Sequence, residues 1–141
     1  MKRKTLFPAS ILIFTILLIC AGCGTRQSIR IDEEKSYFSD FSIVDDEVQI
    51  VCYVTICNEY DTEKTVCIKG DFSNEVENGL LSEAELYAVD SEKARCAYTL
   101  QPKEEKSVYV TFTGTFAGNA HMTSRLLPPI TIEEVLQYRH L

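Results

Sequence analysis

The sequence predicts an all-β fold, an antiparallel β-sandwich of about seven short strands. Apolar side chains recur mostly at every second position from Tyr37 onward, which is the spacing of half-buried strands. Turn-forming residues separate these segments, and no long helical pattern interrupts them. The segment from Tyr37 to the C-terminus is close to the usual size of a sandwich domain, about 100 residues, and is long enough to bury one core.

The composition of the chain excludes two broad classes of protein. Of 141 residues, 45% are hydrophobic and 25% are charged, which is too apolar a balance for a disordered chain. Acidic residues outnumber basic residues by 21 to 14, so the formal net charge is −7. Nucleic-acid binding requires clustered Lys and Arg against the phosphates, and we therefore expect no nucleic-acid partner.

The strongest predicted strand covers Val48–Cys57. One face of it is wholly apolar and the other is partly so, which is typical of a central strand. An acidic turn at Asp45–Glu47 separates it from the shorter apolar segment Phe41–Ile43. On the other side, the polar loop Asn58–Lys64 leads to a strand at Thr65–Phe72, and the two strands are predicted to form a hairpin.

The remaining strands are shorter. Ser82 and Glu85 fit a helix capping box, but the apolar residues that follow favour a strand at Glu85–Val89. The other predicted strands are Ala94–Leu100, Ser107–Phe116 and 130–135, the last of which could also begin a short helix. Ser73–Leu81 and Gln101–Glu105 are predicted as irregular connections between strands.

The N-terminus has the pattern of a secretory signal peptide. Lys2, Arg3 and Lys4 precede an apolar segment, Leu6–Ile19, which is followed by small residues. A membrane-spanning helix needs roughly 20 apolar residues, and the apolar segment here is shorter, so we expect a signal-peptide helix that is cleaved. Its removal takes away basic residues and no acidic ones, which leaves the mature chain more acidic than the whole.

The end of this segment, Ala21-Gly22-Cys23, resembles the lipobox of bacterial lipoproteins. In that family small residues precede a cysteine that is lipidated and becomes the first mature residue, and the resemblance implies this role for Cys23. Cys20 departs from the pattern, because the family usually has Leu there. The chain would then divide into a signal peptide at 1–22, a lipidated N-terminus and tether at 23–36, and a β-sandwich domain at 37–141. Two acyl chains suffice for stable anchoring.

A second pattern covers residues 43–116. A strand is followed by Asn58 and a polar loop, and later Leu100–Glu104, which contains Pro102, leads into the strand around Val108-Tyr-Val110. This pattern resembles the immunoglobulin-like domains of small Gram-positive lipoproteins, including the FxLYD-type families of unknown function. The resemblance implies an immunoglobulin-like β-sandwich at the cell surface and supplies no catalytic residues.

Four cysteines follow the lipobox: Cys52, Cys57, Cys67 and Cys96. An even number outside the cytoplasm allows disulfides, in three pairings. Cys52 and Cys96 lie on apolar strand faces and could bridge two sheets, while Cys57 and Cys67 flank the hairpin loop and could pair across it. The alternative is four free thiols that pack as small apolar residues. A zinc site is not expected, because Cys52 and Cys57 lie on opposite faces of one strand.

No group of residues matches a known catalytic pattern, so we expect no enzymatic activity. His121 near Ser124 is the one candidate for a base with its nucleophile, and it lacks the context of hydrolase motifs. Carboxylates gather in the loops at 45–47 and 59–63, where oxygen ligands could bind calcium, but neither loop has the spacing of an EF-hand. We therefore expect neither a metal ion nor another cofactor.

These observations favour a non-catalytic binding or structural domain, held by its lipid at the extracytoplasmic face of the bacterial cell membrane. Its partner would be an envelope protein or polymer, and the irregular loop Gly114–Arg125 is the first place to look for contacts. Two alternatives stay open from the sequence. One is a small secreted metal-dependent hydrolase that uses the loop carboxylates and His121, and the other is a thiol redox sensor that uses the four cysteines.

Overall fold

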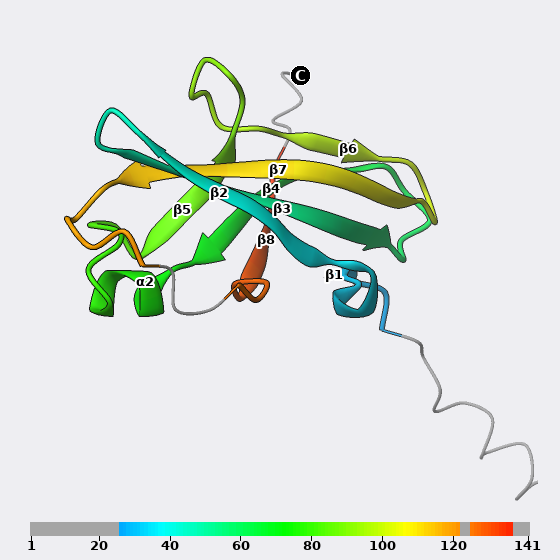
Figure 1. Cartoon of the computed structure of the whole chain (residues 1–141). Helices are drawn as coiled ribbons and strands as arrows, with labels where there is room; N and C mark the ends of the chain where they lie inside the picture. The colour runs from blue at the N-terminus through cyan, green and yellow to red at the C-terminus, as the bar shows by residue number, and fades with distance from the viewer. Residues whose placement is uncertain (1–25, 122–124, 137–141) are drawn as a thin grey trace, which may run out of the picture.

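A computed structural model describes residues 26–121 and 125–136 of the chain. Within these residues it contains eight β-strands, one short α-helix and one 3-10 turn (Figure 1). The strand pairings are antiparallel throughout. The all-β antiparallel fold is therefore confirmed, while the predicted signal-peptide helix and Cys23 lie outside the described residues.

The first layer is built around the longest strand, β3. Its strands are β1 (Ile29–Ile31), β2 (Tyr37–Val44), β3 (Glu47–Asn58) and β7 (Glu105–Thr115). β7 pairs with one side of β3, from Glu47 opposite Thr115 to Cys57 opposite Glu105. β2 and β1 follow one another along the other side, so β3 lies between neighbours, as its doubly apolar pattern predicts.

The second layer is built around β4. Its strands are β4 (Lys64–Asp71), β5 (Glu85–Val89), β6 (Tyr98–Leu100) and β8 (Ile130–Glu134). β8 pairs with one edge of β4, and β6 and β5 pair with successive parts of the other edge. The hairpin predicted between β3 and β4 is therefore wrong, because the loop after β3 leads the chain into the other layer. β5 then changes partner, because Ala88 and Val89 pair with β7 of the first layer. β5 thus joins the two layers around a common core.

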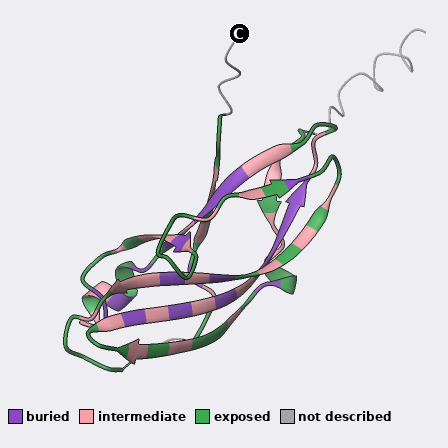
Figure 2. Ribbon diagram, turned by 90° about the horizontal axis from the view of Figure 1, so that it is seen from above, coloured by how far each residue is buried: buried purple, intermediate pink, exposed green. Residues whose placement is uncertain are grey.

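The core lies between the layers and is formed by alternate residues of the strands, an alternation that Figure 2 shows as buried and half-buried positions. Along β3 the predicted apolar face is confirmed, and its members are at most 1% exposed: Val48, Ile50, Cys52, Val54 and Ile56. Phe72, which follows β4, packs edge-on against Phe112 of β7 with 5.2 Å between ring centroids. This aromatic contact links the two layers.

The connection predicted at Ser73–Leu81 contains a short helix, α2 (Ser73–Glu77). Asp71 begins the turn, because its Oδ1 accepts hydrogen bonds from the backbone N–H and the hydroxyl of Ser73 at 2.9 and 2.6 Å. Gly79 ends this region with a φ of 78°, a backbone conformation that glycine adopts readily. One helical turn is too short to give a helical pattern in the sequence.

The strand predicted at 94–100 is shorter than expected, since β6 contains only Tyr98–Leu100. The residues before it form a turn that Asp90 stabilises, because its Oδ1 accepts hydrogen bonds at 2.9 Å from the N–H groups of Glu92 and Ala94. Lys93 occupies this turn with a φ of 63°. The strands predicted at 85–89 and near 130–135 are both present.

The segment predicted as a tether contributes to the fold from Ile29 onward. Ile29 and Ile31 of β1 pack against the core, and the 3-10 turn η1 (Glu33–Lys35) follows. Ser36 fixes the turn to β3, because its Oγ accepts a hydrogen bond at 2.9 Å from the backbone N–H of Thr55. Two isolated apolar residues give no period, and for this reason the sequence did not reveal β1.

Candidate functional site

The outward side chains of β2, β3 and β7 form a surface that we call the tyrosine face. Because alternate residues of these strands enter the core, the residues between them face outward, and the strand register places them in rows. The tyrosine face consists of Tyr37, Asp40, Ser42, Gln49, Val51, Tyr53, Tyr109, Thr111 and Thr113. Asp40, at the β2 edge, is the charged residue among these nine. The next outward row contains Val44, Glu47 and Thr115, of which Glu47 lines the cleft described below.

Three tyrosines form one row across this face. Tyr37 of β2 pairs with Tyr53 of β3, which pairs with Tyr109 of β7. The Tyr37 and Tyr53 rings stack with centroids 5.1 Å apart, and Tyr109 meets Tyr53 edge-on at 5.0 Å. A hydrogen bond with Tyr109 raises the pKa of Tyr37. The two outer rings are 48% and 63% exposed, so they present aromatic surface to the solvent.

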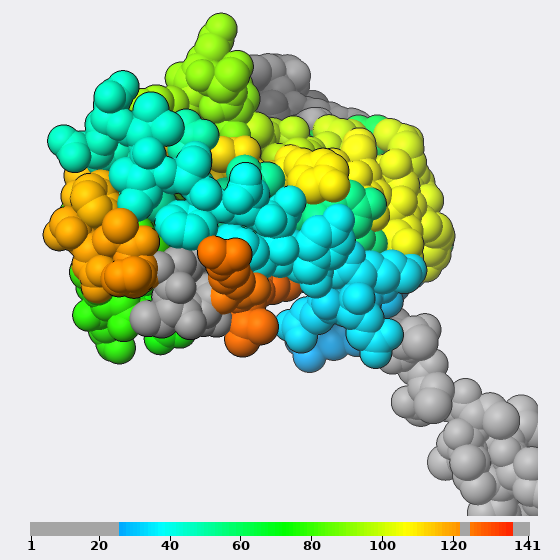
Figure 3. Space-filling view, viewed as in Figure 1, coloured from blue at the N-terminus to red at the C-terminus, as the bar shows by residue number. Residues whose placement is uncertain are grey.

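A polar cleft of about 420 Å³ continues the face beyond the tyrosines. Strands β3 and β7 form its floor, and the end of β5 with the following turn forms its wall. Its lining residues are Glu47, Gln49, Val89, Asp90, Ser91, Lys93, Thr111 and Thr113. Figure 3 shows β2 and β7 in cyan and yellow, with the yellow-green loop after β5 projecting beyond them.

Two of the three charged side chains that line the cleft, Glu47 and Lys93, pair with each other. Lys93 donates a hydrogen bond to the Glu47 carboxylate, which lowers the pKa of Glu47, and Gln49 donates to the same carboxylate at 3.3 Å. Within the described residues, the hydroxyls of Thr111 and Thr113 have no hydrogen-bond partner. The second carboxylate of the cleft, Asp90, keeps its negative charge, because its Oδ1 accepts hydrogen bonds from backbone N–H groups. The cleft therefore offers hydroxyl and amide groups, and the one cation among its described lining residues is already paired.

The opposite outer surface, on the second layer, has a different chemistry. We call it the salt-bridge face, and it consists of Lys69, Glu85, Tyr87, Arg95 and Glu133. Lys69 lies 3.4 Å from Glu85 and 3.3 Å from Glu133. The hydroxyl of Tyr87 donates to Glu133 at 2.7 Å, and the Arg95 guanidinium lies 3.4 Å from the centroid of the Tyr87 ring. The charges and hydrogen-bonding groups of these side chains are therefore paired with one another.

Asn58, which contributed to the family resemblance, has a structural role. Its side chain is buried and its Nδ2 donates to the backbone carbonyls of Thr62 and Gln101, both at 2.9 Å. Its Oδ1 accepts from the N–H of Tyr60 at 3.0 Å. Asn58 therefore fixes the loop after β3 to the turn before β7, and a buried amide with partners of this kind needs no ligand.

The four cysteines are free thiols, and the structure does not bring the proposed pairs together. Cys52 lies in the core, where burial raises its pKa to about 12. Cys57 faces outward from β3 beside Glu105, whereas Cys67 lies on the outer side of β4 opposite Glu133. Burial also raises the pKa of Cys57 and Cys67. Thiols that stay protonated are poor nucleophiles and poor redox sensors.

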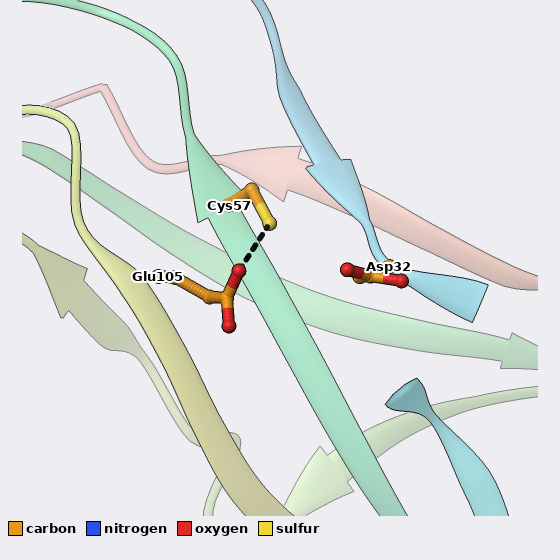
Figure 4. A group of neighbouring side chains, drawn as sticks. All are labelled: Asp32, Cys57 and Glu105. Atoms are coloured by element: carbon orange, nitrogen blue, oxygen red, sulfur yellow. Dashed lines mark hydrogen bonds between the residues drawn. The ribbon is translucent and has the colours of Figure 1, made fainter. Parts of the chain in front are cut away.

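One group of metal-capable side chains occurs among the described residues. Atoms of Asp32, Cys57 and Glu105 lie within 4.8 Å of one another (Figure 4). The Cys57 thiol lies 3.9 Å from a Glu105 oxygen. Lys35 already supplies a cation, because its Nζ lies 2.8 Å from Glu105 and 3.5 Å from Asp32. The Cys57 thiol stays protonated, and the Lys35 ammonium already balances the two carboxylates. An ion pair network therefore accounts for this group without a metal ion.

The carboxylates singled out in the sequence do not converge on a common centre. Glu59 binds Arg30 at 2.9 Å, and Asp61 lies 3.4 Å from Lys103. Glu63 accepts from the Gln101 amide at 2.7 Å. The other acidic loop forms the tight turn between β2 and β3, in which the two aspartates have φ values of 50° and 63°. Each carboxylate thus has its own local role.

The loop expected to meet a partner, Gly114–Arg125, is described in part. Asn119 fastens it to the turn after α2, because its Nδ2 donates to the Asn78 carbonyl at 2.7 Å. His121 is exposed and its backbone N–H lies 3.2 Å from Asn119 Oδ1. Ser124, the suggested nucleophile beside His121, lies outside the described residues.

The sequence did not reveal the tyrosine face, although a signal for it existed. Tyr53 and Tyr109 each occupy an outward position in a strongly alternating strand. Alternation alone does not give the strand register that aligns them with Tyr37, because the register depends on turn geometry and on a bulge between Phe38 and Asp40.

No family model matches the chain, and neither a curated protein nor a solved structure matches it. None of the helices in the described residues combines the length and apolar character needed to cross a membrane.

Proposed function

We propose that this protein is a non-catalytic binding domain that a lipid on Cys23 holds at the extracytoplasmic face of the bacterial cell membrane. The domain binds an envelope component through the tyrosine face and its adjoining cleft. One observation carries the binding part of the proposal. The row of exposed tyrosine rings ends at Tyr109, two residues along β7 from Thr111, and Thr111 lines a cleft whose threonine hydroxyls lack partners among the described residues.

The anchoring part of the proposal is supported by the order of charge and hydropathy along the chain. A basic cluster, an apolar segment and small residues precede Cys23. The remaining chain is strongly acidic, and a bacterial membrane surface is also anionic, so the domain would be repelled from the lipid headgroups. A covalent lipid would then hold the protein while its surface stays free for another partner.

The binding proposal has more support than a hydrolase. Glu59, Asp61 and Glu63 each contact a different polar or cationic side chain, and none of them lines the cleft. Hydrolysis by two carboxylates requires that both face the same bond at a defined separation. Glu47 of the other acidic loop does line the cleft, but its carboxylate is bound by Lys93. Neither acidic loop therefore places two free carboxylates in the cleft.

Mass spectrometry of the protein made in cells tests the anchor. Cys23→Ala should leave the full-length precursor unprocessed and without bound diacylglyceryl, as mass spectrometry would show. Cys20→Leu is the matched control, because it restores the residue that the lipobox usually has and should preserve processing. If Cys23→Ala is processed and lipidated like the unmodified chain, the anchoring proposal is wrong.

Cross-linking in cells tests the binding part. The tethered full-length protein should give higher-mass adducts with a short-range cross-linker, and Tyr109→Ala should lose them. Tyr87→Ala, which removes a tyrosine from the salt-bridge face, should keep them. Equal loss in both variants, or in neither, would contradict binding through the tyrosine face.

A further inference from the structure

We propose that the ligand of the tyrosine face is an uncharged, hydroxyl-rich polysaccharide. This inference rests on the proposed binding function and names the ligand class. It follows from three properties of the same surface: exposed aromatic rings, hydroxyls without partners among the described residues, and the lack of an unpaired cation among the described lining residues of the cleft.

The tyrosine row supplies the apolar part of the contact. A pyranose ring has one face of C–H groups whose hydrogens carry slight positive charge, and the face of an aromatic ring is slightly negative. Tyr109 is 63% exposed and Tyr37 is 48% exposed, so both offer ring surface to such a sugar. The contacts of both rings with Tyr53, at 5.0 and 5.1 Å, hold them in place before a ligand arrives.

The cleft supplies the polar part of the contact. Gln49, Thr111 and Thr113 line its floor, and Ser91 lies in its wall. Hydroxyl and amide groups can both donate to and accept from the hydroxyls of a sugar. The volume of about 420 Å³ falls within the usual range of ligand clefts. Because the cleft adjoins the tyrosine row, a chain of sugars can contact both.

The charge of the surface selects against anionic polymers. The chain carries a formal net charge of −7, and Asp40 is the charged member of the tyrosine face. In the cleft, Lys93 is already bound to Glu47, so it is not available to hold a phosphate or a uronate. A phosphate-bearing polymer would therefore be repelled, whereas a neutral glycan meets no electrostatic penalty.

A protein partner fits this surface less well. The cores of protein interfaces are depleted in Lys, Glu, Asp and Ser, whereas the cleft wall and floor include Glu47, Asp90, Ser91 and Lys93. The apolar side chains on the tyrosine face are the tyrosine row and the half-buried Val51, and the exposed Val44 follows in the next outward row. A small aromatic row beside a polar cleft is suited to a sugar chain.

Affinity electrophoresis tests the inference. The full-length lipidated protein, in an uncharged mild detergent, is run through native gels that contain hydroxyethyl cellulose, glycol chitin or soluble starch. We expect at least one of these neutral polymers to retard the protein. Tyr109→Ala should weaken that binding roughly fivefold to tenfold, the effect of one lost aromatic contact. Tyr109→Phe, which keeps the ring, should bind within about threefold of the unmodified chain.

Tyr87→Ala is the matched control, and circular dichroism verifies that each variant is folded. The mobility of Tyr87→Ala should match that of the unmodified protein in every gel. The inference is wrong if no neutral polymer retards the protein, if only anionic polygalacturonate does, or if folded Tyr109→Ala binds as well as the unmodified chain. An envelope protein cross-linked in cells through the tyrosine face, without any retardation by glycans, would overturn the inference and leave the proposed binding function standing.

Discussion

The two outer faces of this protein are built by the same strand alternation and differ in how their polar groups are satisfied. On the salt-bridge face, Lys69, Tyr87 and Glu133 bind one another, and Arg95 covers the Tyr87 ring. On the tyrosine face, neutral side chains lie in rows, and the hydroxyl of Thr111 has no partner among the described residues. A face whose groups satisfy one another contributes to stability, whereas an unsatisfied face is available for a ligand.

The hydrophobic core lies between the two faces, and a substitution in the core should destabilise both layers together. Phe112→Ala removes a fully buried ring that packs against Phe72 across the layers. We expect it to lower the free energy of unfolding by about 3–5 kcal/mol, measured by urea denaturation. Phe112→Leu, which fills more of the site, should cost less. A loss below about 1 kcal/mol for the alanine variant would contradict the role of this contact.

Asn58→Ala should give the next largest loss of stability, about 2–3 kcal/mol, because it removes a buried amide and its hydrogen bonds to the part-buried carbonyls of Thr62 and Gln101 and N–H of Tyr60. Asn119→Ala is the matched control, since Asn119 is exposed and its side chain holds a single loop carbonyl. The control should lose less than about 1 kcal/mol. Urea denaturation of the three proteins measures the difference, and equal losses would show that Asn58 does not hold the two loops.

The salt-bridge face should show a dependence on pH. The hydrogen bond from Tyr87, and then Lys69, lower the pKa of Glu133. A lowered pKa in the folded state adds stability above the unfolded pKa of glutamate, about 4.3, and this stability is lost as the pH falls through the folded pKa.

Glu133→Gln should therefore lower the thermal midpoint slightly at neutral pH, and the difference should vanish in acid. The effect is small because the carboxylate is exposed to solvent. Calorimetric melting at neutral and acidic pH measures it. A difference that grows in acid would have the wrong sign for this explanation.

The tyrosine face should show the smallest effect on stability. Thr111→Val removes a hydroxyl without a partner among the described residues and keeps the β-branched shape. We expect the free energy of unfolding to change by no more than about 0.5 kcal/mol, measured in the same urea series. A larger loss would mean that this hydroxyl is part of the framework.

The sequence predicted the fold class and its central strand because these depend on local patterns. The alternation from Val48 to Ile56 identified a core face, and every member of it is buried. β1 was missed because Ile29 and Ile31 are too few to show a period, and its pairing with β3 is long-range. The order of the strands depends on such long-range pairings and was not predicted.

The candidate site was harder to predict than the fold. Tyr53 and Tyr109 lie far apart in the chain and become neighbours only through the register between β3 and β7. The cleft depends on the turn at Asp90, which places Lys93 against Glu47. The sequence instead drew attention to acidic loops and cysteines, which the structure explains by local ion pairs and burial.

Site-specific photo-cross-linking in cells tests the central claim most directly. A photoreactive residue replaces Thr111 on the tyrosine face, or Thr131, an exposed threonine on the outer side of β8 that lies opposite Lys69. Both substitutions are made in the full-length tethered protein. We predict an adduct with an envelope component from position 111 and none from position 131. Adducts from position 131 alone, or from neither position, would contradict a binding role for the tyrosine face.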